Sequence, residues 1–300
     1  MGFDLQITRY VFEAKNAGAD FTDVATLGRQ SLHLSPEVLG REARRFGLGS
    51  IADHPGGVFT SDGYVEALLA ALGAEHCHSI DASDFEGATH VLDLNRPVPD
   101  VLAGAFSTII DGGTLEHVFD FPQAVRDVSK MLKVGGHFIS INGTNNFMGH
   151  GFYQFSPELF FRAFSSKNGY DIESMVVTEV NDDGVWYEVT DPASYGDRVQ
   201  LVNNSRTYLM MRARKTADAP DFIEFPQQSD YANTAWRREG PEARDFLVRP
   251  WRQRMVEKFA PGPLRLGLRR LSQATRHHFA ARAYHRREFG RDPEGSQRGH

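Results

Sequence analysis

Two histidines lie where the sequence predicts the ends of strands, and both could exchange a proton with a ligand. His117 belongs to the run TLEHV, and His150 lies in a glycine-punctuated loop further along the chain. Imidazole ionises near neutral pH, so it can accept a proton from a hydroxyl or an amine. A lone histidine is more often structural than catalytic. We expect His150 to face the substrate as the base and His117 to be the second candidate, with Glu116 as a supporting or capping group.

One glycine and three aspartates follow four predicted strands. Gly28 follows residues 24–27, Asp81 follows 77–80, Asp93 follows 89–92 and Asp111 follows 108–110. An aspartate after a strand is, by itself, more often a turn residue or a helix cap. In open parallel sheets, however, ligands bind at the carboxyl ends of the strands. The recurrence of such residues at four strand ends therefore favours a ligand site.

The segment 106–143 contains the elements that must position these side chains. An apolar run ending at Asp111 predicts a buried strand, and apolar residues at helical spacing from Asp120 predict a helix. The pair Gly135-Gly136 is expected to end that helix, and Phe138 begins the next predicted strand. This strand, helix, strand order favours a parallel, right-handed crossover.

The stretch from Phe106 through TLEHV to MLKVGG resembles the fourth strand, following helix and fifth strand of class I S-adenosylmethionine-dependent methyltransferases, in their small-molecule, type 11-like branch. The resemblance covers about the first two-thirds of the chain. It implies an α/β fold, with a Rossmann-like, seven-stranded, mostly parallel sheet. It also implies that the last strand, at residues 207–211, inserts antiparallel between its neighbours and closes the sheet near residue 215.

The resemblance also implies which residues bind S-adenosylmethionine. The first glycine motif is degenerate: Thr26 stands where the family has an acid, and Gly28 and Gln30 remain at the turn. S-adenosylmethionine has no pyrophosphate, so one glycine can suffice there. Asp81 matches the position whose carboxylate takes both ribose hydroxyls. The remaining expected cofactor contacts are Asp93 and Leu94 at the adenine, and Asp111 and Gly112 at the end of the fourth strand.

The loop after the fifth strand has the composition of a substrate pocket, because polar side chains alternate there with phenylalanines. We expect it to bind the acceptor through Asn145, Asn146, Tyr153 and Gln154. The run GHGFYQFSPE within it resembles a subgroup of methyltransferase-like proteins to which no activity is assigned here. No metal site is predicted, since His76, Cys77 and His78 alternate along one strand and point to opposite faces.

Composition indicates a globular chain of 300 residues, with 41% hydrophobic and 24% charged residues. The sequence contains no run of eighteen apolar residues and no signal-peptide pattern. Its single cysteine, Cys77, fits a reducing compartment. We therefore expect a cytoplasmic protein. Four segments are predicted: a methyltransferase-like domain over residues 1–215, a linker over 216–245, a basic helical extension over 246–290 and a disordered tail over 291–300.

The net charge of −6 conceals an arginine-rich segment between residues 249 and 291. This segment is predicted to form a basic amphipathic helix, which could meet an anionic membrane surface or an acidic partner. It could also pack on the acidic domain of its own chain, which is the simplest explanation of the uneven charge. Nucleic acid is not expected, because no aromatic residues are interleaved with the arginines. The sequence does not indicate an oligomeric state.

Three functions remain open from the sequence. The first is a methyltransferase acting on the oxygen or nitrogen of a small molecule, such as a sugar or a secondary metabolite. The second is a catalytically inactive binding or scaffolding protein with the same fold, which the missing glycines favour. The third is a nicotinamide-type nucleotide site, which would need more glycines at the first turn to hold a pyrophosphate. Histidine and asparagine side chains facing a pocket would favour the first function, whereas Gln30 or Leu32 filling the adenosyl site would favour the second.

Overall fold

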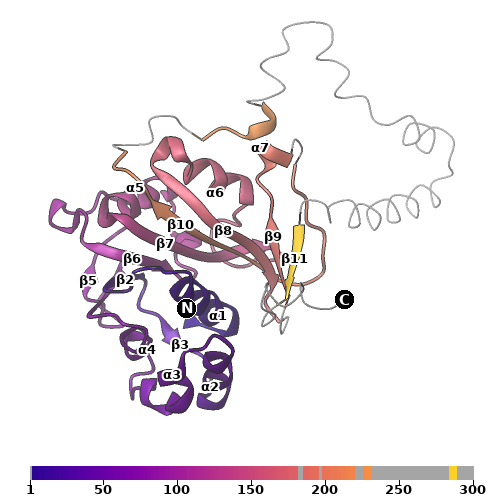
Figure 1. Ribbon diagram of the computed structural model, residues 1–300. Coiled ribbons are helices and arrows are strands. Elements are labelled where there is room, and N and C mark those ends of the chain that lie inside the picture. The colour runs from indigo at the N-terminus through magenta and orange to yellow at the C-terminus, as the bar shows by residue number, and fades with distance from the viewer. Residues whose placement is uncertain (1, 182–184, 196–197, 220–225, 232–283, 289–300) are drawn as a thin grey trace, which may run out of the picture.

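The computed structural model describes residues 2–181, 185–195, 198–219, 226–231 and 284–288 (Figure 1). Its strands are β1 (Gly2–Phe3), β2 (Asp23–Leu27), β3 (Ser31–Leu32), β4 (His76–Asp81), β5 (His90–Val91), β6 (Phe106–Asp111), β7 (Leu132–Asn145), β8 (Tyr170–Glu179), β9 (Val185–Val189), β10 (Thr207–Lys215) and β11 (Tyr284–Glu288). The short strands β1 and β3 pair with each other. The remaining strands form one nine-stranded sheet in the order β11-β9-β8-β10-β7-β6-β2-β4-β5.

The central strands of this sheet confirm the expected α/β architecture. Strands β5, β4, β2, β6 and β7 pair in parallel, whereas β10 is antiparallel to both β7 and β8. If β2, β4, β5, β6, β7, β8 and β10 are numbered 1 to 7 along the chain, their order across the sheet, read from β5, is 3-2-1-4-5-7-6. The predicted insertion of residues 207–211 between two neighbours, and the end of this strand at residue 215, are both observed.

Helices cover both faces of the sheet (Figure 1). Along the chain they are α1 (Leu5–Asn16), α2 (Pro36–Arg45), α3 (Gly49–Asp53), α4 (Glu66–Ala71), α5 (Phe121–Met131), α6 (Pro157–Ala163) and α7 (Pro192–Tyr195). Single 3-10 turns are η1 (Pro55–Val58), η2 (Asp100–Leu102), η3 (Leu115–His117) and η4 (Ser166–Asn168). Several helices begin at a side-chain cap: Asp4, Ser35, Asp120 and Ser156 each accept a hydrogen bond from a backbone N–H of the first turn.

The two faces of the sheet bury two separate hydrophobic cores. Alternation along a strand divides neighbouring residues between them: Ile109 packs with α5 and α6, whereas Ile110 packs with α1, α2 and α4. Helix α1 is also tied to the antiparallel part of the sheet. The indole Nε1 of Trp186 donates to Gln6 Oε1 at 3.0 Å, and the hydroxyl of Tyr208 donates to Asp4 Oδ2 at 3.1 Å.

Three features differ from the sequence predictions. Helix α5 ends at Met131, before Gly135-Gly136, because β7 already begins at Leu132 and pairs there with Phe106. The stretch around Trp186, for which no strand was predicted, forms strand β9. The basic helix predicted to pass through Arg286 is wrong over Tyr284–Glu288, where β11 pairs antiparallel with β9. The sheet therefore has two strands more than the seven predicted.

The rest of the predicted basic extension and its tail, residues 246–283 and 289–300, lies outside the described residues. So does most of the predicted linker. Within the described ranges, no helix is both long enough and apolar enough to cross a membrane.

Candidate active site

The predicted site residues gather at one edge of the sheet, where the carboxyl ends of β4, β2 and β6 lie side by side. Leu27 of β2 pairs with Ile80 of β4 on one side and with Asp111 of β6 on the other. The strand order reverses between β2 and β6, and open α/β sheets bind their ligands at such a switch point. The fold thus brings Gly28, Asp81 and Asp111 to this edge, as predicted.

The turn that follows β2, called the first turn below, closes tightly around Gly28. This residue has a φ of +71°, and a Cβ added to it would lie 2.9 Å from Thr114 Oγ1 and 3.2 Å from Gln30 Nε2. Both neighbouring side chains donate to the carbonyl of Leu27, from Thr114 Oγ1 at 2.6 Å and from Gln30 Nε2 at 2.7 Å. Only glycine meets both requirements, since it tolerates positive φ and leaves room for these side chains.

Gln30 was expected to contact the cofactor through its polar side chain, and the structure shows that this side chain is buried, with 1% of the residue exposed. Its Oε1 lies 2.8 Å from the place where a Cβ of Gly112 would stand, so Gly112 leaves space for the amide. That Oε1 accepts no hydrogen bond from the described residues. The first turn therefore contains a buried acceptor without a donor, at the junction of β2 and β6.

Two of the three predicted aspartates, Asp81 and Asp93, differ in exposure. Asp81 is half-buried, and its carboxylate accepts a single hydrogen bond from the described residues, from Ser83 N at 3.3 Å. Its Oδ2 lies 3.8 Å from the position of a Cβ on Gly28. Asp93 is exposed and accepts hydrogen bonds from Asn95, whereas the side chain of Leu94 is buried in the core. Asp81 thus keeps most of its hydrogen-bonding capacity for a ligand.

Asp111 is fully buried, and its carboxylate points into the protein. Oδ2 accepts from Asn142 Nδ2 at 2.6 Å and from Ser140 Oγ at 3.0 Å, while Oδ1 accepts from Thr114 N at 2.8 Å. Burial raises the pKa of this carboxyl, although these hydrogen bonds act in the opposite direction. Its side chain therefore fixes the turn after β6, and the expected contact of the Asp111 carboxylate with a cofactor stays a prediction.

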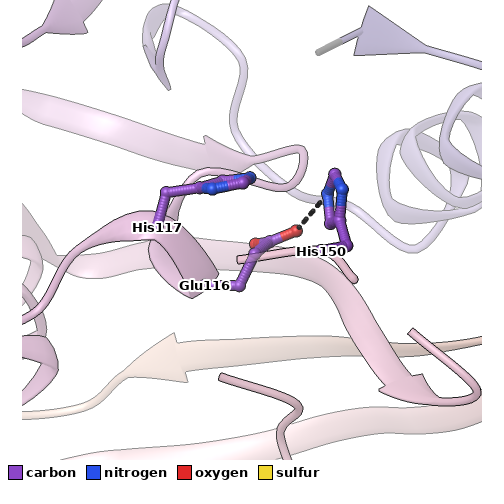
Figure 2. Close-up of side chains that lie close together, drawn as sticks. All are labelled: Glu116, His117 and His150. Atoms are coloured by element: carbon purple, nitrogen blue, oxygen red, sulfur yellow. Dashed lines mark ion pairs between the residues drawn. The ribbon is translucent and has the colours of Figure 1, made fainter. Parts of the chain in front are cut away.

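Glu116, His117 and His150 form a compact cluster beside this turn (Figure 2). The first two end the 3-10 turn η3, and His150 comes from the loop between β7 and α6. His150 Nε2 lies 3.4 Å from Glu116 Oε1, and the two imidazole rings meet edge to face with centroids 4.8 Å apart. The two histidines predicted as catalytic are thus brought together. Glu116, predicted only as a supporting or capping group, lies at the centre of the cluster.

Backbone contacts hold the two loops of this cluster together. Phe152 N donates to the carbonyl oxygen of Glu116 at 2.7 Å. Gly151 has a φ of +69°, and a Cβ on it would lie only 2.7 Å from that same oxygen. A third, more exposed contact joins the same two segments: the hydroxyl of Tyr153 donates to the carbonyl of Phe119 at 2.6 Å. The glycine at position 151 is what allows the His150 loop to lie against Glu116.

The electrostatics of the cluster follow from burial. Burial, followed by repulsion from the charge of Asp111, raises the pKa of Glu116 to about 8. Burial, followed by the neighbouring His150, lowers the pKa of His117. The site therefore holds a carboxyl that exchanges its proton near neutral pH, directly beside two imidazoles.

The predicted acceptor-binding side chains make hydrogen bonds within the protein. The amides of Asn145 and Asn146 both donate to Asn203 Oδ1, at 2.8 and 2.9 Å. Gln154 Oε1 accepts from Phe147 N at 2.9 Å. The sequence did not indicate one aromatic pair: Phe119, which follows η3, and Phe152, on the loop after β7, are mostly exposed and meet edge to face with centroids 5.9 Å apart. The polar residues shape the loop, and the two rings connect it to the segment after η3.

Comparison with known proteins gives likenesses of structure only. No protein-family model matches the sequence, and no curated protein matches it. Similar solved structures include an S-adenosylmethionine-dependent methyltransferase from Mesorhizobium loti, with 15% identity over 69% of this chain and 98% of that one, at a TM-score of 0.38. A branched-chain polyamine synthase from Thermus thermophilus, solved with 5'-methylthioadenosine, shares 15% identity over 76% of this chain and 63% of that one, at a TM-score of 0.39. TehB from Haemophilus influenzae shares 13% identity over 69% of this chain and 61% of that one, at a TM-score of 0.39.

The strand order of the chain itself defines its fold class. The 3-2-1-4-5-7-6 arrangement with an antiparallel seventh member, here extended by β9 and β11, is the class I methyltransferase fold. The fold alone does not assign an activity, which has to be argued from the residues at the carboxyl edge.

Proposed function

We propose that this protein is an S-adenosylmethionine-dependent methyltransferase that methylates an oxygen or nitrogen of a small molecule, such as a sugar or a secondary metabolite. The observation that carries the proposal is the carboxylate of Asp81. It stands beside Gly28 at the switch point of the sheet, is half-buried and accepts a single hydrogen bond, from Ser83 N, among the described residues. Two ribose hydroxyls need two acceptor oxygens in one place, and an ionised aspartate supplies them.

The buried residues of the first turn fit the other end of the cofactor. Gln30 Oε1 has no donor in the described part of the chain, and the α-ammonium of S-adenosylmethionine would supply one. Leu94 and Asp93 lie after β5, where an adenine ring and its amino group would be bound. When bound, the cofactor supplies a methyl group made electrophilic by its sulfonium.

The chain's own residues would hold the acceptor and remove its proton. His150 is partly exposed, and its Nδ1 forms no hydrogen bond with the described residues, so it is free to accept a proton from the acceptor. Glu116 fixes the ring through Nε2 on the other side. The exposed rings of Phe119 and Phe152 would cover an apolar part of the acceptor and help to exclude water.

A second candidate function is supported by the position of Gln30. Its side chain fills the space between Gly28 and Gly112, where the methionine part of the cofactor would lie. If this amide remains in place, the protein is a non-catalytic binding or scaffolding module with the methyltransferase fold.

Calorimetric titration of the full chain with S-adenosylmethionine and S-adenosylhomocysteine tests the proposal. We expect micromolar binding that Asp81→Ala weakens by at least roughly tenfold, since two charge-assisted hydrogen bonds are lost. Asp84→Ala is the matched control, because Asp84 is an exposed acid three residues further along the same loop. Binding that Asp81→Ala leaves unchanged would refute the assignment.

Two substitutions of Gln30 separate the two candidate functions. Gln30→Leu keeps the bulk but removes the acceptor, so in a methyltransferase it should weaken binding of S-adenosylmethionine. Gln30→Ala opens the turn. If the wild-type chain gives no heat and Gln30→Ala gains binding, then Gln30 blocks the site and the non-catalytic function is favoured. Circular dichroism would verify that each variant is folded.

Three further assignments belong to this proposal. A small-molecule acceptor, rather than nucleic acid, is proposed because an exposed aromatic pair, Phe119 and Phe152, connects the two segments that carry the histidines. A cytoplasmic location is proposed from Cys77, whose thiol is inert because burial raises its pKa to about 11. Contact of the basic segment 246–290 with a membrane surface is retained as a prediction.

A further inference from the structure

Three side chains of metal-binding type converge at the cluster. The ligand atoms of Glu116, His117 and His150 all lie within 4.8 Å of one another. No local sequence motif links them, because η3 and the loop after β7 meet only in the fold. Figure 2 shows the carboxyl group of Glu116 pointing to the side on which both imidazoles lie.

Glu116 also has an unused ligand atom. The residue is 2% exposed, and its Oε2 forms no hydrogen bond with the described residues. A buried carboxylate oxygen without a partner is costly, and native proteins usually satisfy such an atom with a donor, a water or an ion. The pairing with His150 uses only Oε1, so it leaves both this oxygen and the approach of His117 unexplained.

We propose that Glu116, His117 and His150 bind one divalent first-row transition-metal ion, with Zn²⁺ as its representative. Two imidazoles and one carboxylate form a set of borderline ligands that suits such ions better than Ca²⁺ or Mg²⁺. Three protein ligands leave at least one coordination position open, as in catalytic rather than structural sites.

The distances need only a small adjustment to reach this coordination. Around a tetrahedral zinc ion, neighbouring ligand atoms lie roughly 3.3 Å apart, given bonds of about 2.0–2.1 Å. The Glu116 Oε1 to His150 Nε2 distance of 3.4 Å already matches this value. All three ligand atoms lie within 4.8 Å of one another, and a turn of the exposed ring of His117 at the end of η3 would bring its nitrogen to coordination distance. The buried member of the set is fixed and the two exposed members can adapt.

This inference does not depend on methyl transfer, because ion binding requires only the three side chains. If the proposed function also holds, the open position faces the acceptor. His150 Nε2 would then bind the ion, and the proton of the neutral imidazole would stay on Nδ1, which could no longer accept one. Activation of the acceptor's nucleophile would therefore pass from the imidazole to the ion's positive charge.

The test uses the full chain stripped of metal by a chelator, then titrated with Co²⁺ and followed by its visible absorption, with Zn²⁺ in competition. We expect one tight equivalent of Co²⁺ with an absorption typical of a nitrogen and oxygen site, displaced by Zn²⁺. Glu116→Gln and His150→Ala should each weaken this equivalent at least tenfold, and His117→Ala should weaken it and change its spectrum. His76→Ala is the matched control, since His76 is exposed and also pairs with a carboxylate, Asp23, on a different strand end from this cluster.

Two outcomes would overturn the inference. One is the absence of stoichiometric binding by the folded wild-type chain. The other is a first equivalent whose affinity and spectrum are unchanged in Glu116→Gln and His150→Ala, which would locate the ion elsewhere. Glu116→Gln keeps the size of the side chain, and its melting temperature verifies that lost binding is not lost folding. Titration with S-adenosylmethionine, which reports on Asp81, is independent of these results.

Discussion

Replacing Gly151 by alanine should disrupt the contact between the His150 loop and Glu116. The glycine has a φ of +69°, and its new Cβ would lie 2.7 Å from the Glu116 carbonyl oxygen and 2.9 Å from Glu116 Cγ. The oxygen belongs to the backbone of η3 and cannot rotate away. The loop must therefore move, and the hydrogen bond from Phe152 N to that oxygen lengthens or breaks.

The cost can be estimated from these two effects. A left-handed conformation costs a residue with a Cβ about 1 kcal/mol, and the weakened hydrogen bond costs about 1 kcal/mol more. For a domain of this size, a total of about 2 kcal/mol lowers the melting temperature by roughly 4–8 °C. The movement also carries His150 away from Glu116, so the affinity for Co²⁺ should fall with the melting temperature.

The control for this prediction lies two residues away. A Cβ on Gly149 would meet no atom within 4 Å, and its φ is not positive, so Gly149→Ala should behave as the wild type. Differential scanning calorimetry and Co²⁺ titration of both variants give the comparison. If Gly151→Ala matched Gly149→Ala in both measurements, the docking of this loop on Glu116 would be wrong.

Two further predictions concern buried charges. Lys215→Met should cost about 2–3 kcal/mol in urea unfolding, since the buried ammonium donates to two backbone carbonyls at the end of α5. Arg214→Met should cost far less, because Arg214 is only half-buried and its ion pairs with Asp171 and Glu173 are partly open to solvent. For Glu42, burial favours the neutral acid, but hydrogen bonds from Arg9 and Arg41 prevail and lower the pKa of the carboxyl below 4.5. The ionised Glu42 therefore adds to the free energy of unfolding at any pH above its ordinary pKa of 4.5. This contribution is lost as the pH falls through the lower pKa that Glu42 has in the folded protein. Glu42→Gln should therefore cost about 3–5 kcal/mol at pH 7 and remove part of the decline on acidification; an equal decline in both proteins between pH 6 and pH 3 would contradict this.

The central sheet was predictable because its signals are local. The apolar run before Asp111 and the helical spacing after Asp120 each specify one element, and parallel crossovers restrict their order. Strands β9 and β11 were missed for the opposite reason. Each pairs at the outer edge of the sheet, and a strand in that position depends on its partner more than on its own composition.

The site was predicted in position but not in detail. Residues at the carboxyl ends of strands follow from topology, which is why Asp81 and Gly28 were found at the edge. The contacts of their neighbours depend on residues distant in the sequence. Glu116 looked like a cap because His150 comes 34 positions later, and Asn145 looked free because its partner Asn203 lies after β9. Nothing local indicated that Gln30 would be buried.

The attachment of α1 affects how the domain folds. Its Asp4 and Gln6 are bound by Tyr208 and Trp186, partners that are 204 and 180 residues away in the chain. Closing loops of this length is slow, so α1 should acquire its final packing only after β8, β9 and β10 have assembled. In hydrogen exchange, the amides of α1 should then be protected together with those strands as one cooperative unit, and local fraying of the helix should be rare.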